Sequence, residues 1–203
     1  VYIPEGIPEK HQRIANIISQ KYGLHIRKIK SKYEALTSGI THKIFELIND
    51  AYEPLFGFSR MTQKQIDAYV KMYVPVHDLR RVTLVENDEG ELVAVGISMT
   101  SLSKALQKAK GKLLPFGWWH LLKALFWKRP EALDLLLVAV RPDYQGKGVN
   151  ALLFTDLIPI YKQLGFVYAE SNPELEQNGK VQSQWQYFKT EQHKRRRCYR
   201  KDI

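Results

Sequence analysis

Four consecutive residues near the middle of the chain, Gln145-Gly146-Lys147-Gly148, have the types and spacing that suit the binding of an anion. Glycines let the backbone come close to a ligand because they carry no Cβ atom. A helix that follows such a turn adds unpaired amides and the positive end of its dipole. The combination suits phosphate or pyrophosphate, and Lys147 adds a mobile positive charge. Many Gly-x-Gly turns only connect two elements, however, so both interpretations stay open at this point.

Two known phosphate motifs can be compared with this turn. Gly146-x-Gly148-x-x-Ala151 fits a loose dinucleotide-binding fingerprint, and Glu170 lies at a suitable distance beyond it. That fingerprint follows its strand directly, whereas residues 141–145 intervene here. The P-loop pattern Gly-x-x-x-x-Gly-Lys-Ser/Thr does not occur in the sequence.

A buried strand and an amphipathic helix are predicted on the two sides of the turn. Residues 133–140 form an almost unbroken apolar run bounded by prolines, which is typical of a strand buried on both faces. After the turn, apolar residues recur at spacings of three and four as far as Leu164, and Gly165 then predicts the helix end. The order of strand, glycine turn and helix places the turn at the helix N-terminus, where an anion binds.

The stretch from Val140 to Asn150 resembles motif A of the GNAT acyltransferase superfamily, Val-x-Pro-x-x-Arg/Gln-Gly-x-Gly-Ile/Val-Gly/Ala. Six of its seven defined positions match in order, and Asn150 is the departure. The resemblance implies that the loop holds the pyrophosphate of acetyl-coenzyme A and that the preceding strand holds the pantetheine arm through its backbone. The cofactor-binding residues that it implies are Val138, Ala139, Val140, Gln145, Gly146, Lys147, Gly148, Val149 and Asn150.

Two further segments resemble a subgroup of the same superfamily. Glu170, followed by Leu175-Glu176-x-Asn178, matches a Glu…Leu-Glu-x-Asn pattern, and residues 111–117 match Gly-x-Leu-x-Pro-Phe-Gly. The resemblance implies that Asn178 opens a helix and touches coenzyme A, although asparagine also favours a plain helix cap. The resemblance to this superfamily covers roughly residues 24–203.

Candidate catalytic residues follow from the same chemistry. An amine must lose a proton to attack a thioester, the departing thiolate must gain one, and positioning of the substrates supplies much of the acceleration. Glu170 and Glu176 are the candidate bases, and a solvated carboxylate or a cap is the alternative for each. Many GNAT enzymes carry a tyrosine acid seven residues after the motif asparagine. Trp185 occupies that position here, so Tyr187 is the candidate acid.

The order of the predicted elements is that of the GNAT fold, an α/β (α+β) class with a mixed, mostly antiparallel central sheet flanked by helices. The resemblance implies a splay between the fourth and fifth strands. Residues 24–203 are expected to form the acyltransferase domain, with an inserted helical segment near 102–131, and residues 1–23 a connector from a preceding region. Other predicted elements are helices at 9–22, 40–51, 62–73, 103–110, 118–127 and 180–188, and strands at 24–30, 82–86, 91–100, 166–170 and 195–200.

Composition narrows the class of protein. The 203 residues, 44% hydrophobic and 26% charged, suit one globular domain with an extension. The single cysteine excludes an internal disulfide, and the scattered histidines lack metal-ligand spacing, so no metal is expected. The apolar segment at 118–127 is too short to span a bilayer, and no signal peptide is evident. A cytoplasmic location and no membrane partner are therefore expected.

Charge and aromatic residues bear on possible partners. The formal net charge of +10 favours partners that carry phosphate. The basic tail at 194–201 could bind nucleic acid, but its pattern favours an exposed terminal strand, so nucleic acid is not the expected partner. The aromatic residues in 118–127 could line an acceptor pocket; core or a subunit contact, as in a homodimer, is favoured because aromatics dominate both.

The sequence thus predicts an N-acetyltransferase that transfers an acetyl group from acetyl-coenzyme A to an amine on a small molecule or peptide. The rival hypothesis is a non-catalytic module of the same fold that binds coenzyme A or regulates a partner. Trp185, in the usual tyrosine position, favours the rival. The intact glycine turn disfavours it, because a domain without cofactor has no need of Gly146 and Gly148.

Overall fold

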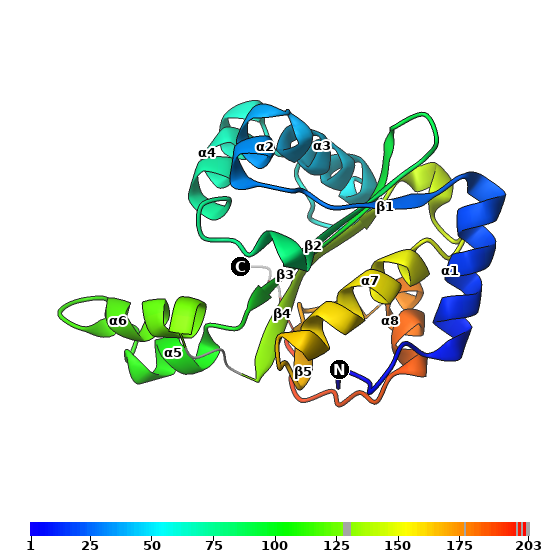
Figure 1. Ribbon diagram of the computed structural model, residues 1–203. Helices are drawn as coiled ribbons and strands as arrows, with labels where there is room; N and C mark the ends of the chain where they lie inside the picture. The colour runs from blue at the N-terminus through cyan, green and yellow to red at the C-terminus, as the bar shows by residue number, and fades with distance from the viewer. Residues whose placement is uncertain (128–130, 177, 198, 200, 202–203) are drawn as a thin grey trace.

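A five-stranded sheet forms the centre of the computed structural model, which describes residues 1–127, 131–176, 178–197, 199 and 201 (Figure 1). The strands lie in the order β1-β2-β3-β4-β5, antiparallel from β1 to β4 and parallel between β4 and β5. Their bounds are β1 (His25–Arg27), β2 (Val82–Glu86), β3 (Leu92–Thr100), β4 (Ala132–Val140) and β5 (Tyr168–Ser171). The predicted mixed, mostly antiparallel sheet is confirmed.

Helices cover both faces of this sheet. Figure 1 shows α2, α3 and α4 on one face, α1, α7 and α8 on the other, and α5 and α6 projecting away from the end of β3. The helices are α1 (Glu9–Tyr22), α2 (Lys32–Thr37), α3 (Ile40–Tyr52), α4 (Gln63–Tyr73), α5 (Ser103–Lys108), α6 (Gly117–Leu122), α7 (Asn150–Gln163) and α8 (Gly179–Gln184). No described helix is both long enough and apolar enough to cross a membrane.

Two hydrophobic clusters join the layers, one on each face of the sheet. Val85 and Val93 belong to the cluster under α1 and α7, whereas Leu84 and Val95 belong to the cluster under α3. All four side chains are fully buried. This division follows from strand geometry, because successive side chains of a strand point to opposite faces. The sheet that carries the candidate site is therefore fixed from both sides.

Helix α1 packs against α7 as part of the first cluster. Ala15 and Ile18 of α1 are buried in the cluster that contains Leu152 of α7. The first residues also join the sheet edge, since the amide of Ala169 donates to the carbonyl of Val1 at 2.8 Å. The domain boundary at residue 23, and the connector that it defines, stay predictions.

Hydrophobic spacing predicts several elements closely. Helix α1 has the predicted bounds, and the capping box of Thr62 and Gln65 begins α4 as predicted. Helix α2, which begins after its Ser31 cap, is missing from the prediction. The predicted strand at 195–200 is wrong for the positions described, because residues 189–197 and 199 form neither helix nor strand; residues 198 and 200 lie outside the described residues. Basic side chains of this tail form ion pairs instead.

Residues 101–127, which we call the α5–α6 arm, connect β3 to β4. The helix predicted at 118–127 is divided, since α6 ends at Leu122 and a π-helical turn, Lys123–Trp127, follows. The aromatic side chains expected in the core are exposed instead: Trp118, Trp119, Phe126 and Trp127. The core alternative is therefore wrong, because the arm projects from the sheet and no described element covers it (Figure 1), and the alternative of a subunit contact stays a prediction.

Candidate functional site

The glycine turn leads from β4 into α7 and leaves several backbone amides unpaired. A short 3₁₀ turn, Pro142–Tyr144, precedes Gly146 and Gly148, whose φ angles of 76° and 86° lie in the left-handed region that favours glycine. The amides of Gly146, Gly148 and Val149 have no hydrogen-bond acceptor in the part of the chain that the structure describes. With the N-terminus of α7, they form a cradle suited to a phosphate-sized anion.

The two glycines meet different surroundings. A Cβ atom built on Gly146 would have no atom within 4 Å, so this side of the turn is open to a ligand. A Cβ atom on Gly148 would lie 2.9 Å from Cγ2 of Ile14 in α1. A glycine is therefore needed at position 148 both for the φ angle and for the packing of α1 against the turn. At position 146 it is needed for the φ angle and for the close approach of a ligand to the backbone.

Two basic side chains of the turn are held beside it. The Nζ atom of Lys147 lies 5.0 Å from the ring centre of Tyr22 and 4.8 Å from that of Tyr144, within the range of cation–π attraction. Hydrogen bonds with Asp143 raise the pKa of the Arg141 guanidinium and offset its charge. The ammonium group of Lys147 thus lies beside the turn, where it would add to the attraction of an anion.

The fourth and fifth strands separate close to the turn. Pairing of β4 with β5 ends at Leu135 and Ser171, and from there to Val140 β4 is paired only with β3. At this point consecutive residues of β3 pair with the two neighbours of Leu136, which makes Leu136 a β-bulge. The Nδ2 atom of Asn172 donates to the carbonyls of Leu135 (3.1 Å) and Leu136 (2.8 Å). Bulge and asparagine together hold the predicted splay open.

Beyond the splay, the backbone of β4 presents unpaired groups. The amide of Arg141 donates to the carbonyl of Val93 at 2.8 Å. Along an antiparallel pair of strands, residues that bond to the partner strand alternate with residues whose amide and carbonyl point away from it. Ala139 therefore faces β3, whereas Val138 and Val140 direct their amides and carbonyls to the edge that β5 has left. These two amides have no hydrogen-bond acceptor among the described residues. An extended chain with its own amides could pair here.

The carbonyls of the same edge accept from two side chains. The hydroxyl of Tyr52 in α3 donates to the Val138 carbonyl (3.0 Å), and Nε2 of Gln145 donates to the Val140 carbonyl (3.1 Å). Burial raises the pKa of Tyr52, so its hydroxyl keeps its proton. Sequence reasoning missed Tyr52 and Asn172, since one resembles an ordinary helix end and the other an ordinary turn residue.

The remaining candidate cofactor-binding residues differ in whether they present a group to a ligand. Ala139 is 2% exposed and its backbone faces β3, so it presents no group to a ligand. Val149 has an equally buried side chain but an available amide. Nδ2 of Asn150 donates to Oε1 of Gln184 (3.1 Å), which links the start of α7 to α8. Asn178 caps α8, as the alternative interpretation had it, and its contact with coenzyme A stays a prediction.

The two candidate bases contact the basic tail. A hydrogen bond from Lys194 holds the pKa of Glu170 below its usual range, which weakens that carboxylate as a base. Glu176 forms an ion pair with Arg195. Both roles stay predictions, because neither carboxylate is aimed at the open edge by any contact in the structure. No group of His, Cys, Asp or Glu that could hold a metal ion is found among the described residues.

The candidate acid, Tyr187, lies near the start of α1. The hydroxyl of Tyr187 accepts from Lys10 near the start of α1. Trp185, in the position where the resemblance implies a tyrosine, packs its ring 6.2 Å from that of Phe154, and its indole N–H donates to Glu174 (2.7 Å). Trp185 therefore has a packing role that a tyrosine acid would not have, and the role of Tyr187 stays a prediction.

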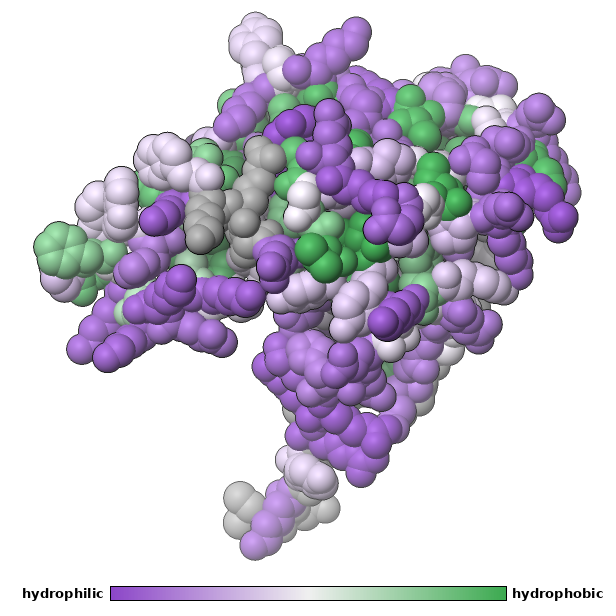
Figure 2. Space-filling view, turned by 60° about the horizontal axis from the view of Figure 1, so that its bottom comes forward, coloured by the Kyte–Doolittle hydropathy of each residue, from purple (hydrophilic) through white to green (hydrophobic). Residues whose placement is uncertain are grey.

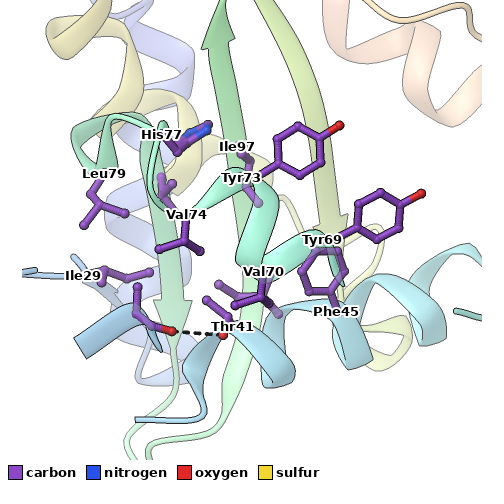
Figure 3. Close-up of a pocket in the computed structure, with 13 residues that line it drawn as sticks. Ile29, Thr41, Phe45, Tyr69, Val70, Tyr73, Val74, His77, Leu79 and Ile97 are labelled. Atoms are coloured by element: carbon purple, nitrogen blue, oxygen red, sulfur yellow. Dashed lines mark hydrogen bonds between the residues drawn. The ribbon is translucent and has the colours of Figure 1, made fainter. Parts of the chain in front are cut away.

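An apolar pocket of about 90 Å³ lies between α3, α4 and the sheet (Figure 3). The rings of Phe45, Tyr69 and Tyr73 form a row along it, with centroids 6.1 and 5.9 Å apart. Ile97 of β3 lines its opposite side and pairs with Leu137 of β4, next to the bulge. The pocket is thus one strand away from the open edge, a separation of about 5 Å between strand axes.

His77 is a buried polar residue that lines this pocket. It is 7% exposed, its ring bonds to the backbone of Ser98, and its Nε2 atom has no partner in the described structure. Burial, assisted by the charge of Arg81, lowers the pKa of His77 to about 4, so the ring is neutral at pH 7. An apolar cavity with one available nitrogen suits a ligand that is mostly hydrocarbon.

Comparison with known proteins comes from one curated relative and from solved structures. No protein-family model matches the chain. A curated protein named bacterial ceramide synthase, from Caulobacter vibrioides (strain NA1000 / CB15N), is 32% identical over 124 residues, which are 61% of this chain and 31% of that protein. The match thus spans a little under a third of the relative's length.

Solved acetyltransferases share the fold at low sequence identity. An aminoglycoside acetyltransferase from an uncultured soil metagenomic sample, in complex with sisomicin, has a TM-score of 0.55 at 12% identity and covers 91% of this chain and 99% of its own. An N-acetyltransferase from Staphylococcus aureus Mu50 has a TM-score of 0.51 at 13% identity, with 81% of each chain covered. With its splayed fourth and fifth strands and glycine turn, the chain has the GNAT acetyltransferase fold.

Proposed function

We propose that the protein is an N-acyltransferase that takes its acyl group from a coenzyme A thioester, with acetyl-coenzyme A as the simplest donor. The observation that carries the proposal is a pair of neighbouring sites with unpaired backbone amides. One is the β4 edge at Val138 and Val140, and the other is the turn at Gly146 and Gly148, which follows β4 in the chain. Coenzyme A has matching groups. Its pantetheine arm is an extended chain of amides that would pair with the edge like an added strand, and its diphosphate would bind at the N-terminus of α7.

The reaction joins an amine nitrogen to the thioester carbonyl carbon and breaks the carbon–sulfur bond. The amine gives up one proton and the departing thiolate takes one, so no further reactant is needed. The amides at Val138 and Val140 would orient the thioester and polarise its carbonyl. Tyr52 keeps its proton and its hydroxyl lies at this edge, so we assign it, in place of Tyr187, the protonation of the thiolate.

We further propose that the amine acceptor carries a hydrocarbon chain. The relative from Caulobacter is named a ceramide synthase, and a ceramide is an amide of a long-chain amine. The apolar pocket beside His77, one strand from the open edge, supports the same substrate class. This acceptor is more specific than the small-molecule or peptide amine expected from the sequence.

The rival function is a module of the same fold that binds coenzyme A without catalysis. The observation in its favour is Trp185, whose indole is held by Glu174 in the position where the resemblance implies a tyrosine acid. The two functions differ in one measurable outcome. An enzyme and a binding module would both bind coenzyme A, but only the enzyme would release free coenzyme A thiol from the acyl donor.

Thiol release from acetyl-coenzyme A and from a long-chain acyl-coenzyme A tests the proposal, with methylamine as one acceptor and dodecylamine, kept below its critical micelle concentration, as the other. Release should require both substrates, and kcat/KM should be at least about tenfold higher for dodecylamine, because each buried methylene contributes roughly 0.8 kcal/mol. Tyr52→Phe should lower kcat and leave the affinity for coenzyme A unchanged. Binding of coenzyme A without thiol release for any donor–acceptor pair would establish the rival module.

A further inference from the structure

The α5–α6 arm, residues 101–127, exposes many large apolar side chains to solvent in the described structure. Figure 1 shows α5 and α6 projecting from the rest of the protein, and in Figure 2 green and pale side chains gather at the same end, beside a band of purple ones. The exposed large apolar residues of the arm are Leu106, Leu113, Leu114, Phe116, Trp118, Trp119, Phe126 and Trp127. An exposed group of this size is uncommon on a protein surface that contacts only water.

The tip of the arm is held in a defined shape. A Cβ atom on Gly117 would lie 1.7 Å from the carbonyl of Lys112, so only glycine lets the loop close this tightly. The backbone and indole N–H groups of Trp118 donate to Leu113 (3.0 Å) and Pro115 (2.9 Å). The loop closed in this way presents Leu114 to solvent at 78% exposure. Phe116 is 73% exposed beside it.

Three indole rings form a surface cluster behind the tip. The ring centroid of Trp119 lies 5.9 Å from that of Trp118 and 5.5 Å from that of Trp127. The rings pack on one another, no described element covers them, and Trp127 is 66% exposed. Tryptophan has an apolar ring with a polar N–H group, which is the combination enriched where a bilayer meets water.

The charge of the arm has one sign. Five lysines lie between residues 101 and 127, and the same stretch contains neither aspartate nor glutamate. All five are exposed: Lys104, Lys108, Lys110, Lys112 and Lys123. Surfaces that bind other proteins are enriched in aromatics but depleted of lysine, whereas interfacial membrane surfaces combine tryptophan, phenylalanine and leucine with many lysines.

We propose that the α5–α6 arm docks the protein on the surface of a membrane with anionic lipids. The tip residues Leu113, Leu114 and Phe116 enter the boundary between headgroups and acyl chains, the tryptophans lie at the headgroups, and the lysines face anionic phosphates. This proposal replaces the expectation from sequence that no membrane partner is involved. It rests on the exposed surface of the arm and does not depend on the proposed catalysis.

The base of the arm is joined to the strand that carries the candidate site. The amide of Ser101, at the base of the arm, donates to the carbonyl of Ala132, the first residue of β4. Leu136, where β4 and β5 separate, lies four residues further along the strand, about 13 Å away. The arm that docks on the membrane is thus attached directly to the strand that forms the open edge.

Co-sedimentation of the 203-residue chain with vesicles tests this proposal. Vesicles of phosphatidylcholine with about 30% phosphatidylglycerol should bind the protein, and pure phosphatidylcholine should bind it about tenfold or more weakly. Leu114→Ser with Phe116→Ser should weaken binding to the anionic vesicles by at least about tenfold, because the tip would no longer enter the bilayer. The matched control is Phe56→Ser, which removes a 92% exposed aromatic outside the arm and should leave binding unchanged.

A charge variant distinguishes attraction of the vesicles by the lysines of the arm from attraction by the net charge of the whole protein. Lys108→Gln with Lys110→Gln and Lys112→Gln should weaken binding to anionic vesicles by about tenfold, through the loss of roughly 1 kcal/mol or less per lysine. The control changes the same number of exposed lysines elsewhere, Lys21, Lys43 and Lys64, and should have a clearly smaller effect. Equal losses in the two triple variants would show that net charge, not the arm, attracts the vesicles and would overturn the proposal.

The other partner that such a surface could take is a second copy of the chain. Sedimentation velocity without lipid should show a monomer whose size is unaffected by the tip variant. A dimer that dissociates on Leu114→Ser with Phe116→Ser, together with vesicle binding that this variant does not weaken, would overturn the proposal in favour of a subunit interface.

Discussion

Gly146→Val is expected to weaken the binding of coenzyme A by at least about a hundredfold, roughly 3 kcal/mol, while the domain stays folded. The valine side chain would occupy the open side of the turn, where the amides of Gly146 and Gly148 must meet the diphosphate. The φ angle of 76° adds strain of about 1–3 kcal/mol for a β-branched residue. Isothermal titration with coenzyme A measures the affinity, and urea unfolding measures the stability.

Two variants of the same turn serve as comparisons. Gly148→Val should destabilise the domain by about 1–3 kcal/mol more than Gly146→Val does, since its side chain would also press on Ile14 of α1. Lys147→Ala should weaken coenzyme A binding by less than about tenfold, because an exposed charge contributes about 1 kcal/mol or less. If Lys147→Ala proves more damaging to binding than Gly146→Val, the site does not bind through its backbone amides.

Acidification is expected to destabilise the protein through His77. The pKa of this side chain is lowered from 6.5 to about 4 by burial and by the charge of Arg81. Below pH 6.5 the unfolded chain binds a proton that the folded chain refuses, so the stability due to neutral His77 is complete above pH 6.5 and is lost as the pH falls toward 4. The loss should be roughly 3 kcal/mol of unfolding free energy.

Urea unfolding at several pH values between 4 and 7 measures this loss. His77→Gln, which removes the titrating group and can still bond to the backbone, should flatten the pH dependence over that range relative to the wild type. His120→Gln is the matched control, since His120 lies on the projecting arm, and it should keep the wild-type dependence. An unchanged pH dependence in His77→Gln would show that folding does not lower the pKa of His77.

Local patterns explain which parts of the fold could be predicted. Helix α1 and the start of α4 follow from apolar spacing and from the capping box of Thr62 and Gln65, which are properties of neighbouring residues. The glycine turn is equally local, because Gly146 and Gly148 specify their own φ angles. Motif resemblance then adds the splay between β4 and β5, which no local pattern specifies.

Long-range contacts explain what could not be predicted. Tyr52 and Asn172 are brought to the β4 edge from segments far apart in the sequence, and the hydrogen-bond partners that they find there are backbone carbonyls, which leave no sequence signal. The exposure of Trp118 on the arm depends on the absence of a covering layer, whereas its residue type alone favours burial. The ion pairs of the tail are also long-range, since Lys194 has its partner in Glu170 of β5.

Titration of the wild-type chain with coenzyme A, with adenosine and with inorganic pyrophosphate tests the central claim most directly. The account predicts one coenzyme A molecule bound per chain, competition by pyrophosphate, and much weaker binding of adenosine, because the unpaired amides of Gly146, Gly148 and Val149 would bind the diphosphate. Coenzyme A at about a hundred times its dissociation constant should also raise the stability by roughly 2.7 kcal/mol. Absence of binding at millimolar coenzyme A would contradict both the enzyme and the rival module.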